Sequence, residues 1–164
     1  MINNISVTFG SKDLLNTIKQ QHPERPLKLF VSDNNEDSFE LIDPSGEKSI
    51  FKNPINYNVI THDGNDNWAG YISYINLELD DNQQKILDAT INDIIDSHSL
   101  PSGVDSIYSL NVSKKTSNRV ILTTWNDSKQ LLKWYHSKSA NQFFQFNDKL
   151  DSNYFEIIYQ AVKN

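Results

Sequence analysis

The stretch that decides the fold is Arg119 to Phe146, RVILTTWNDSKQLLKWYHSKSANQFFQF. It opens with a run rich in β-branched residues, 120–124, which predicts a buried strand ending at Trp125. Asn126 and Asp127 follow, with side-chain oxygens of the kind that cap free N–H groups at the start of a helix. The helix expected next carries apolar residues at near-helical spacing, so one face should pack against a sheet. These apolar residues are Leu131, Leu132, Trp134 and Tyr135.

A second aromatic cluster follows this helix and contains Phe143, Phe144 and Phe146. The aromatic residues of the strand, the helix and this second cluster have two possible roles. They can line a pocket for a small flat ligand, or they can pack against one another and fill that space. Both interpretations stay open, because aromatic residues at helical spacing are more often part of a core. The candidate lining residues of such a pocket are Ile75, Trp134, Phe144, Tyr71 and Trp125.

The length, net charge and composition of the chain limit the kinds of protein it can be. Its 164 residues can form one domain or two small ones. A net charge of −6 argues against a nucleic-acid surface, and no run of about 18 apolar residues is present to cross a membrane. The N-terminus lacks the pattern of a signal peptide, and the absence of cysteine excludes disulfides and thiolate chemistry. We therefore expect a cytoplasmic protein without a nucleic-acid or membrane partner.

The segment before residue 67 predicts a smaller α+β half. Ser11 is a credible cap for a helix that ends before Pro23. A short helix is expected from Pro54 to Ile60, because proline suits the first position of a helix. The cluster Asp63–Asn67 is the best boundary, which divides the chain into 1–66 and 67–164. The strands expected in this half are Ile5–Phe9, Leu27–Val31, Phe39–Ile42 and Ser49–Phe51.

The second half has the order β-α-β-β-α-β, which is the ferredoxin-like order. Strand 70–79 alternates so that Tyr71 and Ile75 face one way, while Ile72 and Tyr74 face the other. The second face therefore needs a cover, and we expect the N-terminal half to supply it in the same chain. A helix capped by Asp80 or Asp81, a strand at Val104–Val112 and a last strand at Tyr154–Val162 complete this half.

The motif VILTTWNDSKQLLKWYHSKS resembles the signature of the antibiotic-biosynthesis-monooxygenase (ABM) superfamily. Within it the chain is most similar to haem-degrading monooxygenases of the IsdG and HmoB type and to the signal-transduction protein TRAP. The N-terminal segments DLLNTIKQQHP and NPINYNVI extend this resemblance over most of the chain. The resemblance implies an α+β fold: a ferredoxin-like ABM domain of the dimeric α+β barrel type, with the N-terminal half completing the barrel.

The resemblance also implies a haem site made by an Asn on the first ABM strand, the second Trp, and a haem-ligating His ten residues later. The second Trp is Trp134, but the other two positions fall on Ile75 and Phe144. Asn76 cannot replace the Asn, because neighbouring strand residues point to opposite faces. Apolar groups neither ligate iron nor hydrogen-bond to an iron-bound oxygen. We therefore expect no haem cofactor and no confident catalytic residue.

His136 is the one candidate for a displaced haem ligand. It lies two residues after Trp134, about 200° round the helix, and should point away from the Trp face. His22, His62 and His98 lie near expected helix ends and show no metal-ligand spacing. No metal site is expected.

Three functions stay open. The leading hypothesis is an ABM-domain protein that lacks the haem chemistry and binds a small aromatic ligand or acts as a degenerate monooxygenase. The alternatives are a non-catalytic TRAP-like regulatory or interaction protein, and an active cofactor-free or haem monooxygenase. A monomer with an internal pseudo-dimer is expected, with a homodimer as the alternative.

Overall fold

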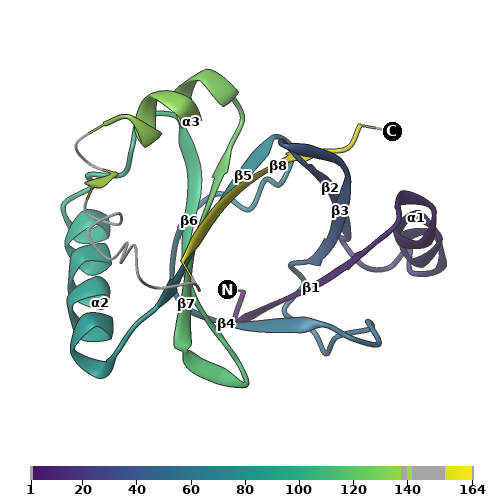
Figure 1. The fold of residues 1–164 in the computed structure, drawn as a ribbon, viewed down its shortest axis with the longest axis horizontal. Coiled ribbons are helices and arrows are strands. Elements are labelled where there is room, and N and C mark those ends of the chain that lie inside the picture. The colour runs from purple at the N-terminus through teal and green to yellow at the C-terminus, as the bar shows by residue number, and fades with distance from the viewer. Residues whose placement is uncertain (1, 138–139, 142–153, 164) are drawn as a thin grey trace.

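Eight strands close into one barrel in the computed structural model, which describes residues 2–137, 140–141 and 154–163 (Figure 1). The order of strands around the barrel is β1-β3-β2-β8-β5-β7-β6-β4, and all neighbours are antiparallel. Along the chain the elements are β1 (Asn4–Gly10), α1 (Lys12–Gln21), β2 (Lys28–Ser32), β3 (Asn35–Asp43), β4 (Ile55–Gly64), β5 (Tyr71–Glu78), α2 (Asp81–Asp96), β6 (Val104–Val112), β7 (Lys115–Trp125), α3 (Ser128–Tyr135) and β8 (Phe155–Ala161).

Each half of the chain contributes four neighbouring strands to the barrel. The first half gives β4-β1-β3-β2 and the second gives β8-β5-β7-β6, so both have the same ferredoxin-like order. Pairing of β4 with β6 and of β2 with β8 joins the two halves. The α+β fold, with an N-terminal half that completes the barrel, is confirmed. The division into domains 1–66 and 67–164 stays a prediction, and its boundary falls between β4 and β5.

Two elements predicted for the first half are wrong. Residues 55–64 form strand β4 and not a helix, and residues 49–51 are not a strand. The reason is a period of two: Ile55, Tyr57 and Val59 alternate with asparagines, and Tyr57 faces the barrel core. The half therefore ends in a strand and lacks only its second helix. His62 consequently lies within a strand, where its ring stacks on Tyr108 with centroids 4.2 Å apart.

The apolar residues divide into three clusters. The first fills the barrel, the second lies between the outer face of the sheet and α2 and α3, and the third lies under α1. Figure 1 shows the helices at the two ends of the molecule with the barrel between them. The predicted alternation of β5 is confirmed, because Ile72 and Tyr74 lie in the barrel cluster while Ile75 and Leu77 lie in the outer one.

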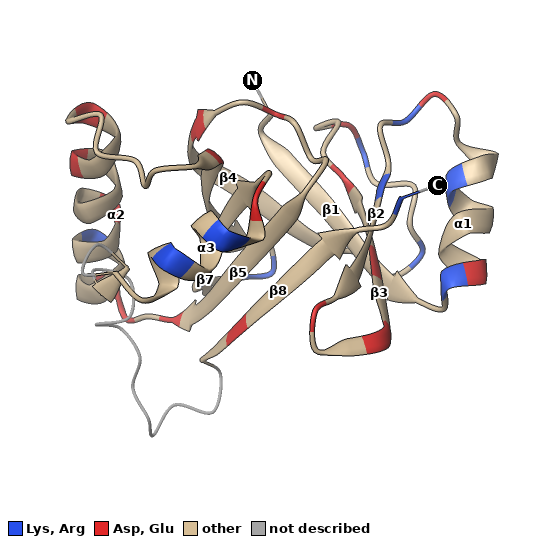
Figure 2. Cartoon of the chain, turned by 90° about the horizontal axis from the view of Figure 1, so that it is seen from above, with Lys and Arg blue, Asp and Glu red and all other residues tan. Residues whose placement is uncertain are grey.

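The helices begin where the sequence provides caps. Ser11 and Asp127 accept hydrogen bonds from backbone N–H groups of α1 and α3, and Asp80 forms a capping box with Gln83 at the start of α2. Charged residues lie mostly on the helices and turns, as Figure 2 shows. Within the described residues, no helix is both long and apolar enough to cross a membrane.

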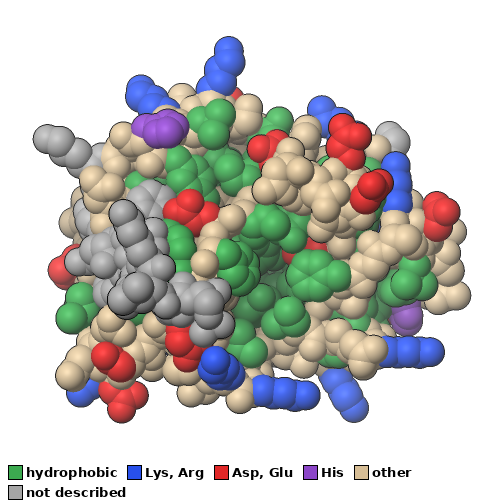
Figure 3. All heavy atoms as spheres, in the orientation of Figure 1, with side chains coloured by type: hydrophobic (Ala, Val, Ile, Leu, Met, Phe, Trp, Pro, Cys, Tyr) green, Lys and Arg blue, Asp and Glu red, His purple; other side chains and the backbone are tan. Residues whose placement is uncertain are grey.

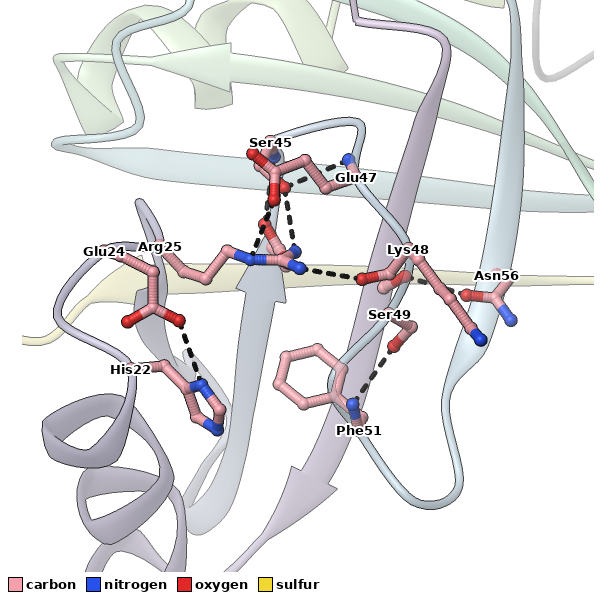
Figure 4. A network of polar contacts seen from close by, with 11 residues as sticks. His22, Glu24, Arg25, Ser45, Glu47, Lys48, Ser49, Phe51 and Asn56 are labelled. Carbon is pink, nitrogen blue, oxygen red and sulfur yellow. Dashed lines mark hydrogen bonds and ion pairs between the residues drawn. The ribbon is translucent and has the colours of Figure 1, made fainter.

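A half-buried arginine, Arg25, holds the long connection between β3 and β4 (Figure 4). Arg25 Nη1 donates to Asp43 Oδ2 at 2.7 Å and to Ser45 Oγ at 3.2 Å, and Nη2 donates to the Lys48 carbonyl at 3.0 Å. Its Nε lies 3.1 Å from Glu47 Oε2. Because the Arg25 and Asp43 side chains are only 11% and 1% exposed, this ion pair is shielded from water.

Candidate functional site

Two tryptophans form the centre of the predicted site, between the sheet and α3. Trp125 ends β7, Trp134 lies on α3, and their ring centroids are 5.5 Å apart at an interplanar angle of 36°. Ile75 of β5 belongs to the same cluster, and Tyr71 packs against it at its edge. The structure thus places four of the five predicted lining residues together. The fifth, Phe144, lies outside the described residues.

The local sequence explains why α3 sits so close to the sheet. Asp127 Oδ1 accepts a hydrogen bond from the Lys129 N–H at 2.8 Å, so the helix begins directly after β7. The indole N–H of Trp125 donates to Thr123 Oγ1 at 2.8 Å, which fixes the ring. At Gly70 a Cβ atom would lie 2.1 Å from the Trp125 carbonyl oxygen, so only glycine allows β5 to start beside this turn.

The cluster is filled by its own side chains. Ile75, Trp125 and Trp134 are 0%, 1% and 4% exposed, and the cluster's described residues include no histidine. Asn76 is on the opposite side of β5, 6% exposed and facing the barrel interior. Among the described residues of this cluster, the side chain at position 75 is apolar and no imidazole lies beside Trp134, so these residues offer neither of the polar groups that the expected haem site would need.

Open space lies on the other side of α3. A cavity of about 310 Å³ runs between the end of this helix, β8 and the turn between β2 and β3. A smaller hollow of about 180 Å³ shares Asp33, Leu132 and Ile158 with it. We call the larger cavity the α3–β8 groove. Its lining residues are Asp33, Asn34, Leu132, Tyr135, His136, Glu156, Ile157 and Ile158.

The end of α3 brings both an aromatic ring and an imidazole to the groove. The Tyr135 hydroxyl hydrogen-bonds to the Ser73 hydroxyl, and burial raises the pKa of Tyr135 to about 12, so this phenol stays neutral at ordinary pH. His136 caps the C-terminus of the helix and is exposed. His136 lines the groove and is not part of the tryptophan cluster.

Sequence reasoning missed the groove because barrel closure creates it. The Asp33 N–H donates to the Ile158 carbonyl at 2.8 Å, where β2 pairs with β8. That pairing joins segments about 125 residues apart, and no local pattern specifies it. The alternation of side chains in residues 155–161 indicates a strand, but it does not predict which strands pair with it. Among the described residues, no group of three or more His, Asp or Glu side chains could hold a metal ion.

Comparison with known proteins finds the same fold in several solved structures. An uncharacterised ferredoxin-fold protein related to antibiotic biosynthesis monooxygenases, from Listeria monocytogenes, matches with a TM-score of 0.84 at 15% identity, over 99% of this chain and 96% of that one. A haem-degrading enzyme from Listeria monocytogenes matches with a TM-score of 0.78 at 15% identity, over 97% and 99%. A major regulator of staphylococcal pathogenesis matches with a TM-score of 0.79 at 19% identity, over 98% and 99%.

These likenesses confirm the fold that the resemblance in the sequence predicted. No protein-family model matches the sequence, and no curated protein matches it at a significant level. The chain is thus similar in fold, over its whole length, both to monooxygenase-like proteins and to a regulator.

Proposed function

We propose that this protein binds a small flat aromatic molecule in the α3–β8 groove, on a monooxygenase-like fold whose haem site is replaced by packed apolar side chains. The observation that carries the proposal is the complete burial of Ile75 against the two tryptophans. Space for a ligand is found on the other side of α3. Its volume of about 310 Å³ is at the lower end of the range for small-molecule sites, roughly 300–1,000 Å³.

The chemistry of the groove suits an aromatic ring with polar substituents. Leu132, Ile157 and Ile158 supply apolar walls, and Tyr135 offers a ring for stacking. Asp33, Asn34, His136 and Glu156 supply hydrogen-bonding groups around these walls. A flat ligand can therefore bury its ring while its substituents meet polar partners.

The fold alone does not decide between catalysis and binding. The same architecture occurs in a haem-degrading enzyme and in a regulator of pathogenesis, and one fold commonly hosts unrelated functions. The apolar replacement at Ile75 favours a protein without haem chemistry, which is compatible with ligand binding or with a regulatory role. An active monooxygenase is the competing hypothesis, and it requires a bound cofactor or a reactive substrate in this groove.

Indole is a suitable neutral probe for the groove, with binding followed by protein NMR. We expect saturable shifts at Tyr135, Ile157 and Ile158. Leu132→Trp adds bulk at a side chain that lines the groove and is 51% exposed, so it should weaken indole binding at least tenfold without unfolding the protein. Ile86→Trp is the matched control, because Ile86 is 52% exposed on α2 and does not line the groove.

Equal indole affinity in the wild type and in Leu132→Trp would refute the site. Shifts confined to residues outside the groove would refute it as well.

A further inference from the structure

A buried carboxyl group, that of Glu40, lies inside the barrel and does not line the α3–β8 groove. Glu40 of β3 is 1% exposed and pairs in register with Phe30, a member of the barrel cluster. Because side chains alternate along a strand, Glu40 and Ile42 both point into the barrel, whereas Leu41 points toward α1. A carboxyl group in such a place is costly unless a partner compensates it.

Three tyrosines surround this carboxyl group. Tyr57 from β4, Tyr74 from β5 and Tyr159 from β8 are 9%, 5% and 4% exposed, and the rings of Tyr74 and Tyr159 meet edge to face at 5.8 Å. Within the described residues, neither Glu40 Oε1 nor the Tyr74 hydroxyl makes a well-formed hydrogen bond, although both atoms are buried. The Tyr74 hydroxyl nevertheless lies near enough to the carboxyl group to lower its pKa, so Glu40 has a phenol beside it but no cationic side chain among the residues that line its cavity.

The same residues enclose a cavity of about 80 Å³. This volume lies between that of one water, roughly 30 Å³, and that of an apolar cavity that holds benzene, roughly 150 Å³. Phe9, Ile55 and Phe155 also line it and are 50%, 37% and 52% exposed, so the cavity reaches the surface through an apolar mouth. Figure 3 shows hydrophobic side chains gathered around a hollow near the middle of this face.

The cavity is lined by acidic but not by basic side chains. Its ten lining residues include Glu40 and the three tyrosines but no Lys, Arg or His, and Asn76 is the one further polar side chain among them. Aromatic rings attract cations through their negative faces, and a carboxylate accepts hydrogen bonds from N–H donors. A small cation with N–H groups suits both kinds of group, because its charge is attracted to the rings and its N–H groups donate to the carboxylate oxygens.

We propose that the barrel interior is a binding site for a small alkylammonium ion, held by the Glu40 carboxylate and the rings of Tyr57, Tyr74 and Tyr159. The ammonium group donates to Glu40 Oε1 and its alkyl part lies toward the mouth. The size of the cavity limits the ligand to roughly three to five heavy atoms. Of the residues that line this cavity, Ile157 alone also lines the α3–β8 groove, and the proposal here does not rest on a ligand in that groove.

The ionisation of Glu40 gives the site a pH dependence. Burial raises the pKa of Glu40 to about 8, and the nearby Tyr74 hydroxyl offsets only part of that rise. The other titratable groups that line the cavity are the three tyrosines, and burial raises the pKa of each. Only Glu40 therefore titrates between pH 6 and 9 within the cavity, and affinity for a cation should fall roughly tenfold for each pH unit below 8.

Ethylammonium chloride is the probe, with the ring resonances of the three tyrosines as the NMR readout at pH 9. We expect saturable shifts with an affinity of about millimolar, the range open to so small a ligand. Ethanol, the neutral counterpart, should bind at least tenfold more weakly. Glu40→Gln should reduce ethylammonium affinity at least tenfold, whereas Glu36→Gln, which removes an exposed carboxylate from the same strand, should leave it unchanged.

Glutamine has the shape of glutamate, so the fold should survive, and the comparison with ethanol needs no variant at all. The absence of saturable shifts in the wild type would overturn the proposal. So would equal binding of ethanol, or undiminished ethylammonium binding in Glu40→Gln.

Discussion

The buried Glu40 should make the stability of the whole protein depend on pH. Its pKa is about 8 in the folded protein, against 4.5 for the ordinary side chain. Between these two values the folded chain holds a proton that the unfolded chain has lost, so the free energy of unfolding falls as pH rises through this window. The slope is about 1.4 kcal/mol per pH unit, which gives a loss of up to about 5 kcal/mol between pH 4.5 and 8.

Glu40→Gln removes the titration and keeps the shape of the side chain. Urea unfolding of this variant and of the wild type, followed by tryptophan fluorescence from pH 5 to 9, gives the difference between their unfolding free energies. That difference should shift in favour of the variant by several kcal/mol as pH rises, then level off above pH 8. Glu36→Gln is the control with the same change of charge. A difference between wild type and Glu40→Gln that does not vary with pH would refute a buried, protonated Glu40.

Two further substitutions test the packing. Trp134→Ala should lower the free energy of unfolding by about 3–5 kcal/mol, because a 4% exposed ring in contact with Trp125 is lost; a loss near 1 kcal/mol in urea unfolding would instead indicate that the ring lines an open cavity. Arg25→Ala should cost about 3–5 kcal/mol, because it leaves Asp43 buried without its partner. Lys115→Ala breaks an exposed ion pair and should cost at most about 1 kcal/mol, so equal losses in the two variants would contradict the role given to burial.

Local patterns in the sequence predicted most elements because their apolar residues have a clear period. The helix after Asp80 and the alternation in β5 are examples, and the strand–Trp–helix motif around Trp125 correctly placed Trp134 against the sheet. The error at β4 came from reading Pro54 as a helix start, although the following residues alternate with a period of two. There the tertiary structure overrides a weak local signal.

The interior of the barrel was harder to foresee. Glu40 lies between Phe39 and Leu41, and a charged residue at an alternate strand position normally faces water. Closure of the barrel turns this face inward, so the carboxyl group becomes buried beside residues from five other strands. The groove beside α3 has the same origin. In both cases the site consists of residues that only long-range strand pairing brings together.

The most direct test of the central claim is a haem titration followed by absorption spectroscopy. The wild type should show at most a weak hydrophobic complex, without the sharp Soret shift of axial histidine ligation, and His136→Ala should leave its spectrum unchanged. A histidine-ligated spectrum in the wild type that disappears in His136→Ala would contradict the account and identify the groove beside α3 as a haem site.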